Sequence, residues 1–226
     1  MPIIKDIRIY KSSTENIAGN PFPSSLKNMK LSCAVHRIAM KLRENGFSLG
    51  DFDHLYINLT TCPIEGTLSP VKREKDKYHP WFCYYDVEVN QDLFEELETP
   101  QCIAYIIEIV EQVLQKYFCT PNFDSELIHH CISDAVIKGE EMTMKFKEKR
   151  ASKNKAIIYL RYLDNTRYFP LLRVWDLEDN LLLEKDLPET SCLDVYGEIQ
   201  LSVRKVTIKP RKNSFSNNLE PIDFML

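Results

Sequence analysis

The sequence predicts an α+β protein: a mainly antiparallel sheet with a C-terminal β-meander, packed against about three helices. Two observations predict helices. Apolar residues recur every three to four positions at 26–45, and the polar residues of 103–118 occupy one narrow stripe of an otherwise apolar segment. A third is the change of period after Gly139, beyond which apolar and polar residues alternate nearly to the end. Since a period near 3.6 is typical of helices and a period of 2 of strands, a helix-rich half, 1–139, precedes a β-meander half, 140–209.

The first elements are a strand and a helix. Residues 3–10 alternate between apolar and polar types, which predicts a strand. Gly46 stands where a left-handed residue would end the helix at 26–45. The apolar stripe of this amphipathic helix comprises Leu31, Val35, Ile38 and Leu42.

Two further strands flank a segment without periodicity. Residues 53–60 alternate, and 81–89 alternate more clearly than any other segment. Between them, 61–79 contains prolines, a glycine and a charged run, which predicts an exposed, mobile loop or hairpin. One face of the strand at 81–89 carries Phe82, Tyr84, Asp86 and Glu88.

Two helices and the meander complete the chain. Thr99 followed by a proline predicts the start of the second helix, and a shorter helix follows at about 124–138. Asp-Asn pairs at 164 and 179 predict hairpin turns between sequential antiparallel strands. Pro170 argues against a central place for its strand unless a bulge intervenes. The predicted strands are 142–148, 156–163, 168–175, 181–185 and 195–208, the last with a break.

The simplest domain organisation is one α+β domain at 1–209 followed by a tail at 210–226. Two intimately packed halves are also compatible with a length of 226 residues. The patterns leave open whether the C-terminal strands join the sheet that contains 81–89 or form their own.

The composition argues against several classes of function. Six dispersed glycines provide no phosphate-binding loop, and a net charge of −4 argues against nucleic-acid binding. Two basic stretches, 145–155 and 204–212, have few aromatics and are interpreted as solvated strand edges. Seven cysteines without paired spacing, after a start that does not resemble a secretory leader, predict a reduced cytoplasmic location. We predict no cofactor and no membrane span.

Asp86 and Glu88 form the one pair that suggests metal chemistry. Alternate residues of a strand point the same way, so both carboxylates can share a divalent cation. A metal-dependent hydrolase or nuclease, helped by Glu140 or Glu141, is therefore an alternative function. A solvated acidic strand face is the plainer interpretation. Cys62 has no base that the sequence places beside it, so we predict no catalytic and no metal-binding residue.

Two segments are densely acidic. Residues 86–98 contain six acids and no basic residue, and 176–189 contain six acids and one lysine. Such charge attracts a basic partner and raises its association rate, although it also serves solubility. The predicted partner-binding residues are Asp86, Glu88, Asp92, Glu95, Glu96, Asp176, Glu178 and Asp179.

The segment 79–90, HPWFCYYDVEVN, with its acidic continuation, resembles a motif of small cytosolic immunity proteins from bacterial polymorphic toxin systems. The likeness covers roughly residues 50–120. It implies a non-enzymatic protein that binds a cognate toxin and masks its active site, often through acidic residues. We therefore predict a protein-binding module whose partner is a protein such as a basic toxin domain. A structural subunit of a larger assembly is a further alternative.

Overall fold

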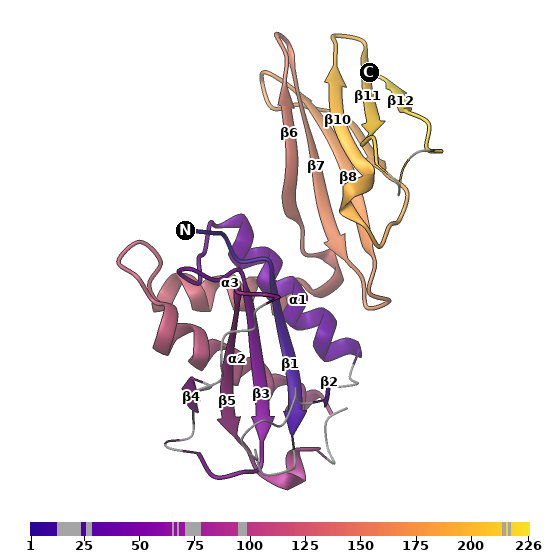
Figure 1. Cartoon of the computed structure of the whole chain (residues 1–226). Helices are drawn as coiled ribbons and strands as arrows, with labels where there is room; N and C mark the ends of the chain where they lie inside the picture. Colours follow the sequence, from indigo (N-terminus) through magenta and orange to yellow (C-terminus); the bar gives the residue numbers. More distant parts are fainter. Residues whose placement is uncertain are drawn as a thin grey trace. The chain divides into compact units, whose positions relative to one another are not determined.

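A computed structural model divides the chain into two compact units, Met1–Gly139 and Glu140–Leu226 (Figure 1). We refer to them as the first and the second unit. Their boundary coincides with the predicted change of period, and the α+β class is confirmed. The structure describes residues 1–12, 24–25, 29–64, 66, 68–70, 78–94, 99–213, 216 and 218–226.

The first unit contains a mixed sheet. Its strands are β1 (Asp6–Ser12), β2 (Ser24–Ser25), β3 (His54–Thr60), β4 (Leu68–Pro70) and β5 (Phe82–Glu88). The strand order is β2-β1-β3-β5-β4. The central strands β1, β3 and β5 are parallel, whereas β2 and β4 pair antiparallel at the edges. The alternation patterns predict the central strands but not their parallel pairing.

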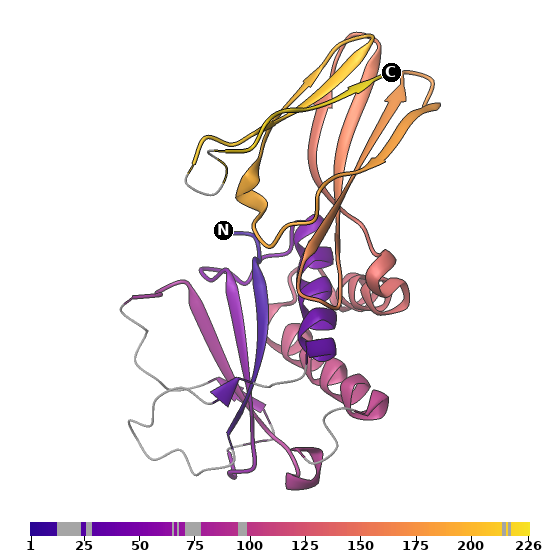
Figure 2. The same cartoon turned by 90° about the vertical axis from the view of Figure 1, so that its right-hand side faces the viewer.

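Helices cover one face of this sheet, as Figure 2 shows. They are α1 (Met29–Glu44), α2 (Pro100–Phe118) and α3 (Ser125–Lys138). Thr99 caps α2 as predicted, because its hydroxyl accepts a hydrogen bond from the amide of Cys102, and Asp124 caps α3 in the same way. The predicted stripe of α1 is completely buried.

Alternation along the central strands separates two faces of the sheet. Leu55, Ile57 and Leu59 are fully buried. Their side of the sheet faces the helices, because Tyr85, the register partner of Ile57, packs on rings of α2. The residues between these buried ones point to the opposite face, on which no α-helix of the described residues packs (Figure 2). This second face therefore carries the polar and aromatic half of each strand, and its central residues Tyr56, Asn58 and Asp86 are nearly buried.

The loop predicted at 61–79 is partly structured. It contains β4, whose residues pair with β5 from Leu68 opposite Val87 to Pro70 opposite Tyr85. Residues 65, 67 and 71–77, which include the charged run, lie outside the described residues.

The second unit is a sandwich of two antiparallel sheets. Their orders are β6-β7-β8-β9 and β10-β11-β12. The bounds are β6 (Met144–Arg150), β7 (Asn154–Tyr162), β8 (Tyr168–Asp176), β9 (Leu181–Asp186), β10 (Tyr196–Leu201), β11 (Lys205–Pro210) and β12 (Ile222–Met225). The sequential order β6-β7-β8-β9 confirms the predicted meander. The sheets share a core of Ala156, Ile158, Leu172, Val174, Leu187, Tyr196, Ile199, Val206 and Ile208.

Two details of this sandwich differ from what the sequence predicts. The segment interpreted as a tail supplies β12, which pairs with β11 and leaves the amide of Leu226 donating to the carbonyl of Arg204. Strand β8 is central, although it contains Pro170. That proline precedes the β8–β9 ladder, whose first pair is Leu171 with Asp186, so its missing amide does not interrupt the ladder to β9.

Candidate functional site

The face of the first sheet that is turned away from the helices is the first candidate site. The parallel register places Arg8, Tyr56 and Tyr84 in one row across the three strands. The next row comprises Tyr10, Asn58 and Asp86. We name this surface the aromatic face and define it as Arg8, Tyr10, His54, Tyr56, Asn58, Phe82, Tyr84, Asp86 and Glu88.

Tyr56 lies at the centre of the aromatic face and is 7% exposed. Its ring centroid is 5.4 Å from that of Tyr10, 4.8 Å from that of Phe82 and 5.0 Å from that of Tyr84. Burial raises the pKa of Tyr56 to about 12, so its phenol is neutral at physiological pH. The neighbouring rings provide several half-buried π surfaces on one face.

Arg8 shows how this face holds a guanidinium group. Its Nε donates to Oδ2 of Asp6 at 2.7 Å, and another guanidinium nitrogen donates to the hydroxyl of Tyr56 at 3.1 Å. The guanidinium carbon also lies 5.6 Å from the centroid of the Tyr56 ring. A carboxylate, a tyrosine hydroxyl and a ring face thus act together on one cation.

Asp86, the first predicted partner-binding acid, is 8% exposed. Its Oδ1 accepts a hydrogen bond of 2.7 Å from Nδ2 of Asn58, which is 5% exposed. Oδ1 of Asn58 is buried and has no hydrogen-bond partner among the described residues. The carboxylate predicted on a solvated strand face therefore lies in a nearly buried polar pair.

The other acids of the first segment have different surroundings. Glu88 is half-buried, and its Oε2 accepts from the amide of Ile64 at 3.2 Å. Asp92 is exposed in the short helix η1 (Gln91–Phe94). Glu95 and Glu96 lie outside the described residues.

The second acidic segment belongs to the other unit and forms the β8–β9 hairpin. The carboxylate of Asp176 accepts from the amides of Glu178 and Asn180, and it also accepts from Nδ2 of Asn180. These hydrogen bonds lower the pKa of Asp176. They also show that its carboxylate stabilises the turn. Asp179 is paired with Lys155 at 2.9 Å, whereas Glu178 is exposed. The negative charge of this hairpin is therefore partly balanced by basic neighbours.

The same hairpin exposes apolar side chains that the sequence analysis did not select. Leu177 is 69% exposed, Leu181 is 51% exposed and Leu182 is 44% exposed. We refer to residues 176–182 as the hairpin tip. An edge position explains the exposure, because β9 pairs with β8 alone among the described strands. The signal in the sequence is the run Leu181-Leu182-Leu183, which is apolar at consecutive strand positions.

The structure shows the surroundings of the residues considered for metal and cysteine chemistry. Asp86 and Glu88 share a face, but no group of three or more metal-ligating side chains occurs within the described parts of the chain. All seven cysteines are free thiols. Burial raises the pKa of Cys83 to about 12 and that of Cys131 to about 11, so both are poor nucleophiles at neutral pH.

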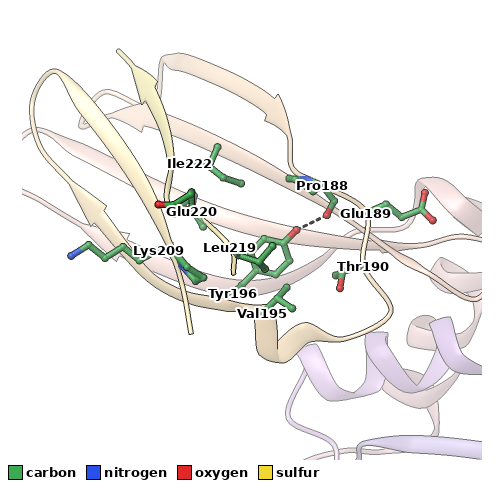
Figure 3. A pocket seen from close by; sticks show the side chains of 11 residues that line it. Pro188, Glu189, Thr190, Val195, Tyr196, Lys209, Leu219, Glu220 and Ile222 are labelled. Atoms are coloured by element: carbon green, nitrogen blue, oxygen red, sulfur yellow. Dashed lines mark hydrogen bonds between the residues drawn. The ribbon is translucent and has the colours of Figure 1, made fainter. Parts of the chain in front are cut away.

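A pocket of about 340 Å³ lies within the second unit (Figure 3). Its lining includes Val195, Tyr196 and Ile222, and the hydroxyl of Tyr196 donates to the carbonyl of Pro188. Among the described residues, no lining side chain has a buried polar atom without a partner. The pocket therefore offers mainly apolar contact.

Acid sensitivity is expected from the polar pairs at the start of β3. Burial by itself raises the pKa of Asp53, but hydrogen bonds from Lys5 and His54, each 2.6 Å long, outweigh burial and leave the pKa below its ordinary value. The folded chain then binds fewer protons than the unfolded chain. The contribution of the Asp53 pairs to stability should therefore be fully present above the ordinary aspartate pKa of about 3.9. It should be lost as pH drops toward the lowered pKa of the folded chain.

Urea unfolding of the first unit at pH 6, 5, 4 and 3 will check this expectation. We expect Asp53→Asn to reduce the loss of stability between pH 5 and pH 3, because the substituted side chain does not titrate. An equal slope in the parent chain and in Asp53→Asn would contradict it.

No family model, curated protein or solved structure matches this chain. Among the described residues, no helix is long and apolar enough to span a membrane. The function is therefore inferred from the aromatic face and the hairpin tip themselves.

Proposed function

We propose that the chain is a non-enzymatic protein-binding module of the immunity or inhibitor type, which masks a partner with a basic surface such as a toxin domain. The observation that carries the proposal is the exposure of Leu177, Leu181 and Leu182 at the acidic hairpin tip. Protein interfaces combine an apolar centre with a polar rim, and exposed apolar side chains that cluster in one segment often mark them.

Charge favours a basic partner over an acidic one. The chain has a net charge of −4, and Glu178 and Asp179 are exposed beside the leucines. Lys155 of the neighbouring strand β7 balances Asp179, so the leucines provide most of the binding energy and the acids mainly accelerate association.

A comparative pull-down from cells of the native host tests the proposal. The parent chain should retain a basic protein partner, and Leu181→Asp combined with Leu182→Asp should reduce its recovery at least about tenfold, because buried charges oppose the apolar contact. Val203→Asp is the matched control, since Val203 is an apolar residue of the same unit with 52% exposure outside the hairpin. The Val203→Asp variant should retain the partner.

Reconstitution from purified components then separates the possible roles. A complex of one chain with one partner, in which the partner loses its activity, supports an inhibitor. Equal recovery by the parent chain and the double variant would refute the role of the hairpin tip. A stable particle of several subunits without an inhibited enzyme would favour the structural-subunit alternative.

A further inference from the structure

Asn58 has an unused hydrogen-bond acceptor inside the aromatic face. Its Nδ2 donates to Asp86, while its Oδ1 is buried without a hydrogen-bond partner among the described residues. Exchanging the two amide positions would direct Oδ1 at the carboxylate, where two acceptors face each other. The amide orientation that satisfies Asp86 therefore leaves a carbonyl oxygen that requires an external donor.

Among the described residues, Asp86 has no positively charged partner either. It is 8% exposed, and no ion pair joins it to a described lysine, arginine or histidine. A carboxylate with so little solvent contact is usually paired with a cation or held by several donors. The Asn58 amide supplies one neutral hydrogen bond. The row of Asn58 and Asp86 thus combines a nearly buried carboxyl group with an acceptor that has no partner among the described residues.

The neighbouring row of the same face binds a cation with similar groups. There Arg8 is held by the carboxylate of Asp6 and by the hydroxyl and ring of Tyr56. Side chains two positions apart on one strand are separated by roughly 7 Å, so the second row lies within reach of the same aromatic surface. It has the carboxylate of Asp86 and the amide of Asn58 but no arginine of its own.

We propose that Asp86 and Asn58, beside the ring of Tyr84, bind the guanidinium group of an arginine side chain on the protein partner. A guanidinium is planar, presents five donors and stacks on aromatic rings, so it can satisfy both acceptors while it lies against a tyrosine. The inference rests on the proposed function and names one anchor of its partner.

Nuclear magnetic resonance titration of the ¹⁵N-labelled full chain tests this anchor. The probe is N-acetyl-arginine amide, and the control is N-acetyl-citrulline amide, which has nearly the same shape and no charge. The arginine probe should produce saturable shifts of the side-chain Nδ2 signals of Asn58, and the citrulline probe should leave these signals in place. Equal shifts with both probes would overturn the proposal.

Matched variants test whether the carboxylate of Asp86 binds the arginine probe. Asp86→Asn should weaken arginine binding at least about tenfold, because a hydrogen bond to a charged group is lost. Asp51→Asn removes an exposed acid of the first unit that belongs to neither acidic segment, and it should bind like the parent chain. Unchanged affinity in Asp86→Asn would overturn the proposal. If that variant does not fold, Tyr84→Leu decides: a loss of about two- to fivefold is expected from the ring, and unchanged affinity overturns the proposal.

Titration with Mg²⁺ and Mn²⁺ provides the competing outcome. Broadening of the Asn58 signals by Mn²⁺, without saturable binding of the arginine probe, would assign the acceptors to a metal and overturn the proposal. The outcome is also separable from that of the pull-down. Failure of the arginine probe with retained hairpin-dependent capture would refute the anchor alone, whereas arginine binding without any captured partner would refute the proposed function alone.

Discussion

Replacing Ile57 by alanine should lower the free energy of unfolding of the first unit by about 3 kcal/mol. Ile57 is completely buried at the middle of the central strand β3, opposite Ile9 of β1 and Tyr85 of β5. Tyr85 in turn packs on the rings of Tyr117 and Phe118 from α2. A cavity here is flanked by β1 and β5, and the packing of Tyr85 on α2 keeps it from collapsing easily, which places the loss within the range of large core truncations.

The distribution of tryptophans makes this loss measurable in one unit. Trp81 belongs to the first unit and Trp175 to the second, so urea unfolding followed by fluorescence in a Trp175→Phe background reports on the first unit. Ile137→Ala is the matched control, because it makes the same chemical change at a site that is 83% exposed. It should change stability by less than about 0.5 kcal/mol. A similarly small effect of Ile57→Ala would contradict the central place of β3.

Most helices and strands could be predicted because their local patterns agree with their final surroundings. The parallel centre of the first sheet could not, since a period of 2 is the same for parallel and antiparallel strands. One signal was present: α1 lies between β1 and β3 in the sequence, and a crossover helix commonly joins parallel neighbours. The connection from β3 to β5 carries no such signal, because the element that its described residues form is the strand β4.

The aromatic face was predicted in part for the same reason. The alternation of β5 placed Tyr84 and Asp86 on one face. Asn58 lies 28 residues before Asp86, on a strand that was predicted from its leucines and isoleucine. Register alone brings Asn58 beside Asp86. A partner that donates from another strand at this distance in the sequence is not visible in local periodicity.

The charge of the hairpin shows a related limit. The acidic segment 176–189 contains one lysine as its sole basic residue. Outside this segment, however, Lys155 of β7 pairs with Asp179, and Arg173 of β8 pairs with Glu184. The local excess of acids is therefore reduced by residues that antiparallel pairing brings to the same face. Counting charges along a segment overestimates its field whenever the neighbouring strands carry the opposite sign.

Replacing Gly197 by alanine should destabilise the second unit by about 2–3 kcal/mol. An added Cβ would lie 2.8 Å from the carbonyl oxygens of Lys209 and Pro210, and backbone atoms of β11 cannot rotate away as a side chain does. The register of β10 shifts between Tyr196 and Ile199, so the glycine lies at an irregularity where the two strands approach closely. Trp175 fluorescence in a Trp81→Phe background measures the effect, and the adjacent Glu198→Ala, at an exposed position, should change stability by less than about 0.5 kcal/mol. Equal stabilities of the two variants would mean that β10 can move away from β11, and the strands would then be less tightly joined than their pairing indicates.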